Sequence, residues 1–253
     1  MNTNNIISDD KKDIDMNSKK NRKYIAFLMD ETGSMSSMGT EPIQGANKFY
    51  KTQKDVASEN GLEVYSTLAF FSEDVRYKHS NKKIDEVSLI EDGEYIPDGM
   101  TALHDSIHDF VDNIRSEIKG IEGETDVVFI ILTDGLDNSS KKYNHKHTKT
   151  LLETLKEEDK WVIIYLGANH DVFTTAKNIG VSNRLSGCYD ATPMGCNYLF
   201  TQLSDNISRC ITSDTRTFEG DFKVPDKISD DWVKVDNMKI RTSSGTLSHS
   251  YSC

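Results

Sequence analysis

The stretch Tyr24-Ile25-Ala26-Phe27-Leu28-Met29-Asp30 is an unbroken apolar run that stops abruptly at a carboxylate. A short apolar run without polar alternation is typical of a strand buried on both faces, as in parallel sheets covered by helices. The polar segment 31–41 follows, and Pro42 then opens an apolar stripe at helical spacing, which predicts a helix with proline in its first turn. The stretch therefore predicts a strand, a loop and a helix, with an aspartate at the end of the strand.

The same alternation continues along the chain. The run 126–133 predicts a second strand buried on both faces, and it too is followed by an aspartate, Asp134. Further strands are predicted at 62–71, 75–77 and 161–166, and helices at 103–118, 144–160, 171–179 and 192–211. Because parallel strands need crossover connections, this order predicts an α/β fold with a doubly wound, mostly parallel sheet and helices on both faces.

Composition divides the chain into three parts. Residues 1–23 are rich in Asn, Asp and Lys and poor in large apolar groups, which predicts a disordered tail. Residues 24–211 are predicted to form the folded domain. Residues 212–253 turn to Ser, Thr and Asp, and we expect this extension either to dock as a small hairpin around 233–240 or to be disordered.

Charge and composition narrow the range of partners. The chain has 253 residues, a net charge of −11 and no apolar run long enough to span a bilayer, so neither nucleic acid nor a membrane is an expected partner. The first 23 residues lack the apolar core of a secretory signal, and the four cysteines lack Cys-x-x-Cys spacing. We expect a cytoplasmic protein with reduced thiols; the sequence does not indicate its oligomeric state.

Oxygen-bearing side chains gather where the predicted strands end. Asp30, Thr32 and Ser34 alternate in the loop after the first strand. Taken alone, this arrangement favours a polar cluster that caps the next helix over a binding site. Thr101 stands just before a helix, and Asp134 ends the other central strand. Because α/β sheets bind ligands beyond the carboxyl ends of their strands, these five residues form a candidate site.

The candidate site contains two carboxylates and three hydroxyls, and no nitrogen or sulfur ligand. Such a set suits a hard cation such as Mg²⁺, Mn²⁺ or Ca²⁺ and suits zinc poorly. Mg²⁺ seldom takes all of its ligands from protein, so we expect a coordination position open to water or to a guest.

The pattern Asp30-x-Thr32-x-Ser34, with Thr101 and Asp134 further along, resembles the metal-ion-dependent adhesion site of von Willebrand factor type A domains. The usual family pattern is Asp-x-Ser-x-Ser. Thr32 therefore departs from it but keeps the hydroxyl, and we expect its added methyl group to tighten the site slightly.

The resemblance covers roughly residues 24–211 and includes two segments outside the site. Residues 39–47 and 166–171 are similar to segments of intracellular and phage- or virus-associated members of the family. The resemblance implies a Rossmann-like sheet with the metal at its upper edge. It also implies a non-catalytic module whose cation recruits an Asp or Glu carboxylate from a protein partner.

The resemblance further implies a division of roles within the site. The hydroxyls of Thr32, Ser34 and Thr101 would contact the cation, and Asp30 and Asp134 would act directly or through water. Neutral oxygen ligands leave a cation electrophilic, so it can accept a foreign carboxylate in its vacant position.

Three other interpretations remain. The domain could be a structural scaffold with a vestigial site, which would bind its partner equally well in a chelator. A Mg²⁺-dependent phosphatase that forms an aspartyl-phosphate would need a second aspartate as general acid where Thr32 stands. His104 and His108 have the spacing of two zinc ligands on a helix, but a third ligand is missing from the sequence pattern, which favours an ordinary amphipathic helix.

Overall fold

The computed structural model describes residues 22–119, 121, 124–157, 159, 161–169 and 171–213. Their centre is a six-stranded sheet in the order β3-β2-β1-β4-β5-β6, in which β2 and β3 pair antiparallel and all other neighbours pair parallel. The strands are β1 (Arg22–Asp30), β2 (Val64–Phe71), β3 (Val75–Lys83), β4 (Thr125–Thr133), β5 (Val162–Gly167) and β6 (Ser186–Cys188). The predicted α/β class with a mostly parallel sheet is confirmed.

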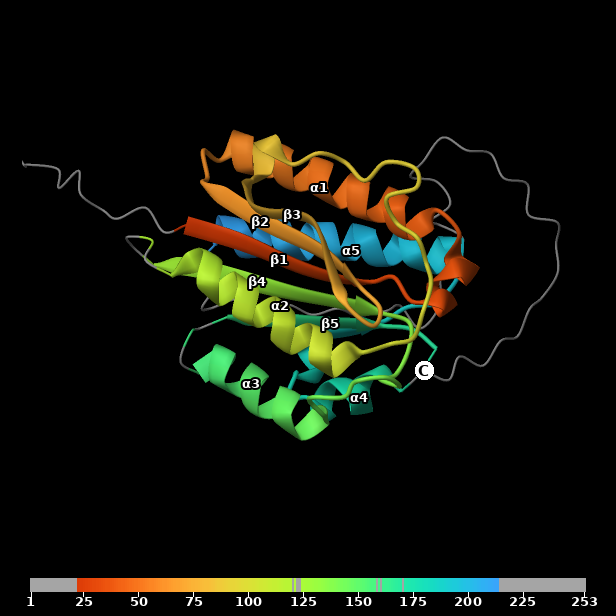
Figure 1. The fold of residues 1–253 in the computed structure, drawn as a ribbon. Helices are drawn as coiled ribbons and strands as arrows, with labels where there is room; N and C mark the ends of the chain where they lie inside the picture. The colour runs from red at the N-terminus through yellow and green to blue at the C-terminus, as the bar shows by residue number, and fades with distance from the viewer. Residues whose placement is uncertain are drawn as a thin grey trace, which may run out of the picture.

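Helices cover both faces of this sheet, as Figure 1 shows, with α1 and α5 on one side and α2, α3 and α4 on the other. The α-helices are α1 (Glu41–Glu59), α2 (Leu103–Ile118), α3 (His145–Glu157), α4 (Val172–Asn178) and α5 (Pro193–Thr212). Three short 3₁₀ helices are η1 (Gly33–Met38), η2 (Ile84–Glu86) and η3 (Asn183–Leu185). Among the described residues, no helix has the length and apolar character needed to cross a bilayer.

The apolar run of β1 lies at the centre of the molecule. Ile25, Phe27 and Met29 pack into the core under α1 and α5, whereas the alternate residues 24, 26 and 28 pack into the core under α2 and α3. Successive side chains of a strand point to opposite faces, so a strand covered on both sides needs apolar residues at every position. This requirement explains the run from which the fold was predicted.

The observed elements differ from the predicted ones mainly at the edges. β1 begins at Arg22, where Lys23 forms a buried ion pair with Asp126 (2.7 Å) and donates to the carbonyl of Ser213 (2.9 Å). β3 is nine residues long, whereas only three were predicted. The prediction was too short because an exposed edge strand has little apolar patterning. The three-residue β6 was not predicted. Residues 1–21 and 214–253, with the expected hairpin at 233–240, lie outside the described residues.

The cysteines differ in state. Cys196 and Cys210 carry free, buried thiols, and burial raises the pKa of each to about 12. Cys188 is disulfide-bonded, so the expectation of reduced thiols is wrong at this residue.

A buried imidazole couples stability to pH. His79 on β3 is 4% exposed, and its ring packs edge-on against Tyr50 with centroids 5.4 Å apart. Burial, with smaller contributions from nearby lysines, lowers the pKa of His79 from its ordinary 6.5 to about 3. Below pH 6.5, His79 therefore binds a proton in the unfolded chain but stays neutral in the folded chain, so acid favours unfolding.

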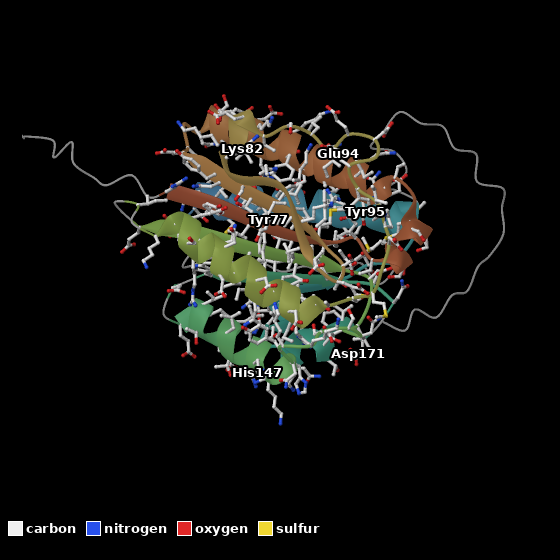
Figure 2. The ribbon with its side chains drawn as sticks, in the orientation of Figure 1. Tyr77, Lys82, Glu94, Tyr95, His147 and Asp171 are labelled. Atoms are coloured by element: carbon white, nitrogen blue, oxygen red, sulfur yellow. The ribbon has the colours of Figure 1, made fainter. Side chains whose placement is uncertain are left out.

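We expect the free energy of unfolding to fall by about 2 kcal/mol between pH 7 and pH 5 through His79 alone. His79→Gln should remove this part of the pH dependence, as measured by urea denaturation across that range. His147→Gln is the matched control, because His147 is exposed on α3 (Figure 2). Equal pH slopes in the wild type and in His79→Gln would contradict the assignment.

Candidate metal centre

The two predicted carboxylates lie side by side at the carboxyl edge of the sheet. Asp30 is the last residue of β1, Asp134 directly follows β4, and these two strands are parallel neighbours. Both side chains are almost completely buried, at 0% and 2% exposed. The chain leaves β1 for β2 on one side and returns to β4 on the other, so the pair stands where the strand order reverses. Ligands bind at this place in open α/β sheets.

Asp30 is held by two hydrogen bonds. Its Oδ1 accepts from the backbone N–H of Thr32 (2.7 Å), and its Oδ2 accepts from the hydroxyl of Thr133 (2.5 Å). Burial raises the pKa of Asp30 to about 6; the hydrogen bonds from Thr133 and Thr32 oppose this rise, and the charge of Asp134 adds to it. Two buried carboxylates that repel each other would be stabilised by a positive charge between them.

The loop after β1 is tied to the end of β4 through hydroxyl groups. The Ser34 hydroxyl donates to Oδ1 of Asp134 (2.6 Å), and the hydroxyls of Thr32 and Ser34 lie 3.0 Å apart. Thr32 is buried, whereas Ser34 is exposed in the first turn of η1. The tight turn of η1 brings the alternate side chains of this loop toward one point.

Thr101 reaches the same edge from the loop before α2. Its backbone N–H donates to the side chain of Asn138 (2.8 Å), and its carbonyl accepts from the backbone N–H of Asn138 (2.9 Å). A Cβ placed on Gly135 would lie 3.7 Å from the Thr101 hydroxyl, so this hydroxyl stands beside the residue that follows Asp134. The structure thus brings all five predicted residues to one edge from three separate segments.

Several residues that support the site were not singled out from the sequence. Thr133 binds Asp30, and Tyr95, which Figure 2 labels, donates from its buried hydroxyl to the carbonyl of Asp30 (2.7 Å). Glu31 is 7% exposed and accepts from the backbone N–H of Ile96 (2.6 Å) and from Arg76 (2.5 Å). Thr133 and Glu31 are sequence neighbours of predicted site residues, and this adjacency was the one feature of the sequence that could have indicated them. Nothing in local sequence marked Tyr95.

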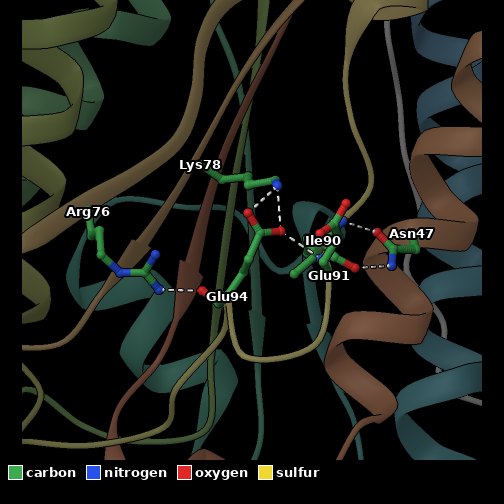
Figure 3. A network of polar contacts seen from close by, with 6 residues as sticks. All are labelled: Asn47, Arg76, Lys78, Ile90, Glu91 and Glu94. Atoms are coloured by element: carbon green, nitrogen blue, oxygen red, sulfur yellow. Dashed lines mark hydrogen bonds and ion pairs between the residues drawn. The ribbon is translucent and has the colours of Figure 1, made fainter.

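The long segment between η2 and α2, residues 87–102, contains Thr101 and is attached to α1 and β3 by a polar network (Figure 3). The side chain of Asn47 donates to the carbonyl of Ile90 (2.9 Å) and accepts from its N–H (2.7 Å). Glu94 accepts from Lys78 (2.6 Å) and, through its carbonyl, from Arg76 (2.7 Å). These contacts give a segment with no regular secondary structure a defined path.

We expect Asn47→Ala to lower the free energy of unfolding by about 1–3 kcal/mol, because two hydrogen bonds to Ile90 are lost. Hydrogen exchange should become faster at the Ile90 amide, as measured by mass spectrometry or NMR. Gln44→Ala is the control on the same helix, since the exposed side chain of Gln44 donates to the hydroxyl of Thr40 (2.9 Å), a residue outside the segment. Unchanged exchange at Ile90 would show that Asn47 does not hold the segment.

The other candidate ligands have structural partners. His104 contacts the hydroxyl of Thr148 (3.1 Å), and the ring of His108 stacks on Tyr143 with centroids 3.6 Å apart. Asp171, a carboxylate that follows β5 near the same edge, accepts from the backbone N–H of Thr174 (3.0 Å), which makes it the N-cap of α4. Within the part of the chain that the structure describes, no three residues of the types His, Cys, Asp and Glu form a group that could hold a metal. A cation at this edge would therefore rely on hydroxyl ligands as well as on carboxylates.

No family model and no curated protein matches this sequence. Among solved structures, proximal thread matrix protein 1 from the mussel byssus, described with a zinc-occupied MIDAS motif, matches at TM-score 0.51 and 19% identity, over 75% of this chain and 46% of that one. The PilB minor pilin from Streptococcus sanguinis matches at 0.52 and 14%, over 77% and 63%. A von Willebrand factor type A protein from Catenulispora acidiphila matches at 0.48 and 14%, over 74% and 42%. The chain thus matches less than two thirds of each of these proteins. At 19% and 14% identity, the matches to the mussel protein and to the pilin, with TM-scores of 0.51 and 0.52, indicate a shared fold only.

Proposed function

We propose that this chain, which has a von Willebrand factor type A-like fold, binds a divalent cation and through it a carboxylate of a protein partner. One observation carries the proposal: three segments far apart in sequence place two carboxylates and three hydroxyls at one edge of the sheet. The hydrogen bond from Ser34 to Asp134 joins residues that are 100 positions apart. The ligands would be Asp30, Thr32, Ser34, Thr101 and Asp134.

The chemistry of this donor set fits a hard cation. All of its side-chain donors are oxygens, which favours Mg²⁺, Mn²⁺ or Ca²⁺ over a metal that prefers thiolate or imidazole. The bound cation would supply an electrophilic centre with an open coordination position. The mussel protein holds zinc in its MIDAS motif, which supports a divalent ion at the corresponding place in this fold. For this chain we propose Mg²⁺, Mn²⁺ or Ca²⁺.

We propose a binding role and not a catalytic one. Thr32 stands where an aspartyl-phosphate phosphatase needs its general acid, and a threonine hydroxyl does not donate a proton readily at neutral pH. Turnover of a chromogenic phosphate ester in Mg²⁺, abolished by Asp30→Asn, would overturn this choice. The net charge of −11 supports a protein partner over nucleic acid. We propose that this chain and its partner meet in the cytoplasm.

A second candidate is a structural scaffold with a vestigial site. It is favoured by hydrogen bonds that need no cation, because the Thr133 hydroxyl donates to Oδ2 of Asp30 and the Ser34 hydroxyl donates to Oδ1 of Asp134. Such a scaffold would have the same thermal stability, and the same partners, in Mg²⁺ and in EDTA.

The experiment that separates the two candidates is a parallel comparison in Mg²⁺ and in EDTA. If the site binds Mg²⁺, saturation at 100 times the dissociation constant should stabilise the fold by about 2.7 kcal/mol, measured by thermal denaturation. A pull-down from cell extract should capture a protein in Mg²⁺ and lose it in EDTA. Identical unfolding and identical captured proteins in both buffers would reject the cation-dependent function.

A further inference from the structure

The exposed apolar side chains of this domain are unevenly distributed. Of the six large apolar residues that are exposed in the described part of the chain, Leu136, Phe173 and Met194 follow the carboxyl ends of β4, β5 and β6. Ile96 and Met100 lie between η2 and α2, in a segment that is hydrogen-bonded to the loop after β1 through Glu31 and Gly33. The sixth, Tyr77, lies on β3 and stacks on Phe110. Single exposed apolar residues are ordinary on protein surfaces, but their concentration along one edge marks an interaction surface.

Three of these residues belong to the segments that carry the oxygen set. Met100 directly precedes Thr101, and Leu136 comes two residues after Asp134. The backbone N–H of Ile96 is bound by Glu31, the residue after Asp30. The exposed fractions of Ile96, Met100 and Leu136 are 62%, 52% and 54%, so each presents about half or more of its surface to solvent beside the candidate cation site.

The backbone under these side chains is anchored. Gly33 donates to the carbonyl of Gly99 (3.2 Å), directly before Met100. Gly135 donates to the Thr133 hydroxyl (3.2 Å), directly before Leu136. Apolar side chains on anchored loops lose little backbone entropy when a partner covers them, and such pre-organisation favours binding.

We propose that Ile96, Met100 and Leu136 form an apolar rim that receives large apolar side chains on either side of the partner's Asp or Glu, with Met194 and Phe173 extending the rim along the edge. The inference rests on the proposed function, because the contact between carboxylate and cation places the partner over the rim. It adds a sequence preference: a single acidic residue flanked by Leu, Ile, Met or Phe.

Charge supports a single carboxylate over an acidic run. Asp98 lies two residues before Met100, Asp137 directly follows Leu136, and the whole chain carries −11. Asp98 and Asp137 would repel a partner segment with several acidic residues. Apolar residues on either side of a single partner carboxylate would bury the rim without this electrostatic repulsion. Cation and rim together thus select an acidic residue in an apolar context.

The test uses three short blocked peptides: one Glu flanked by Leu, the same Glu flanked by Ser, and the Leu-flanked peptide with Gln in place of Glu. Binding to the full chain is measured by methyl NMR in Mg²⁺ and in EDTA, which detects millimolar affinities and reports on Ile, Leu and Met methyl groups directly. We expect the Leu-flanked Glu peptide to bind at least about tenfold tighter than the Ser-flanked one, since burying about two CH₂ groups suffices for this factor. The shifted methyl signals should include those of Ile96, Met100 and Leu136.

Variants separate the rim from the cation site. The triple variant Ile96→Ser, Met100→Ser, Leu136→Ser should lose about tenfold in affinity for the Leu-flanked peptide while its affinities for Mg²⁺ and for the Ser-flanked peptide stay the same. Tyr77→Ser, which removes the exposed apolar residue outside the rim, should change none of these affinities beyond about twofold.

The outcomes distinguish the two proposals. Equal Mg²⁺-dependent binding of both Glu peptides would end the rim proposal and leave the proposed function intact. Leu-flanked binding that persists in EDTA and with Gln would support an apolar surface but reject the cation-dependent function. No binding of the Leu-flanked peptide at millimolar concentration, or shifts confined to methyl groups away from the rim, would overturn the rim proposal.

Discussion

Replacing Asp134 by Asn should lower the affinity of this domain for Mg²⁺ by at least about a hundredfold, because a full negative charge beside the ion is removed while the shape of the side chain is kept. A unit charge about 4 Å from a cation contributes about 4 kcal/mol at an effective dielectric constant of 20, which exceeds the 2.8 kcal/mol of a hundredfold change. Isothermal titration calorimetry with MgCl₂ gives the affinity directly. Asp30→Asn should act in the same direction.

The matched control for this prediction is Asp98→Asn. Asp98 is exposed at the same edge, and its carboxylate accepts from the N–H of Gly99 (2.8 Å) without belonging to the proposed ligand set. Its loss should change Mg²⁺ affinity by no more than about threefold, because exposed charges are strongly screened. Circular dichroism should show an intact fold in all three variants. Unchanged Mg²⁺ affinity in both Asp134→Asn and Asp30→Asn would show that the site is assigned wrongly.

Replacing Gly45 by Val should strongly destabilise the fold, although glycine inside a helix is usually the less stable choice. Gly45 lies on the buried face of α1, where an added Cβ would stand only 2.1 Å from the ring of Phe200 on α5. Gly45→Ala would ordinarily stabilise a helix by about 0.5–1 kcal/mol. Here overpacking reverses the sign, and we expect Ala to cost about 1–3 kcal/mol and Val more, measured by urea denaturation.

Two comparisons make this prediction specific. Lys48→Val introduces the same side chain at an exposed position of α1 and should cost no more than about 0.7 kcal/mol. Phe200→Leu removes the ring, so the double variant Gly45→Ala, Phe200→Leu should be more stable than the sum of the single losses predicts. If Gly45→Ala stabilises the protein, α1 and α5 do not pack as closely as the structure shows.

Much of the architecture was predictable because a strand that is buried on both faces needs an unbroken run of apolar residues, which is easily recognised in the sequence. The apolar runs of β1 and β4 end at Asp30 and Asp134, and both strands occupy the centre of the sheet. The helix predicted at 192–211 buries the apolar residues Leu199, Leu203 and Ile207, which recur every four residues. The elements that were missed or shortened, β6 and most of β3, lie at the two edges of the sheet, where exposure or brevity removes the periodic signal.

The candidate ligands could be nominated from the sequence, whereas the residues that hold them in place could not. Asp30, Thr32 and Ser34 form a local pattern, so sequence alone could nominate them. The hydrogen bond from Tyr95 to the carbonyl of Asp30 spans 65 residues, and that from Thr133 to the Asp30 carboxylate spans 103. Such contacts depend on how the chain folds back on itself, which no local spacing records.

Sequence by itself therefore determined the α/β class, the central strands and the choice of candidate ligands, because apolar periodicity and short-range spacing are properties of neighbouring residues. Only the tertiary structure decided that Ser34 contacts Asp134, that Gly45 leaves room for Phe200 and that Glu31 binds the backbone of Ile96. These relations arise when parallel strands align their carboxyl ends and bring distant loops together. Their physical origin is the packing of the whole chain around one sheet.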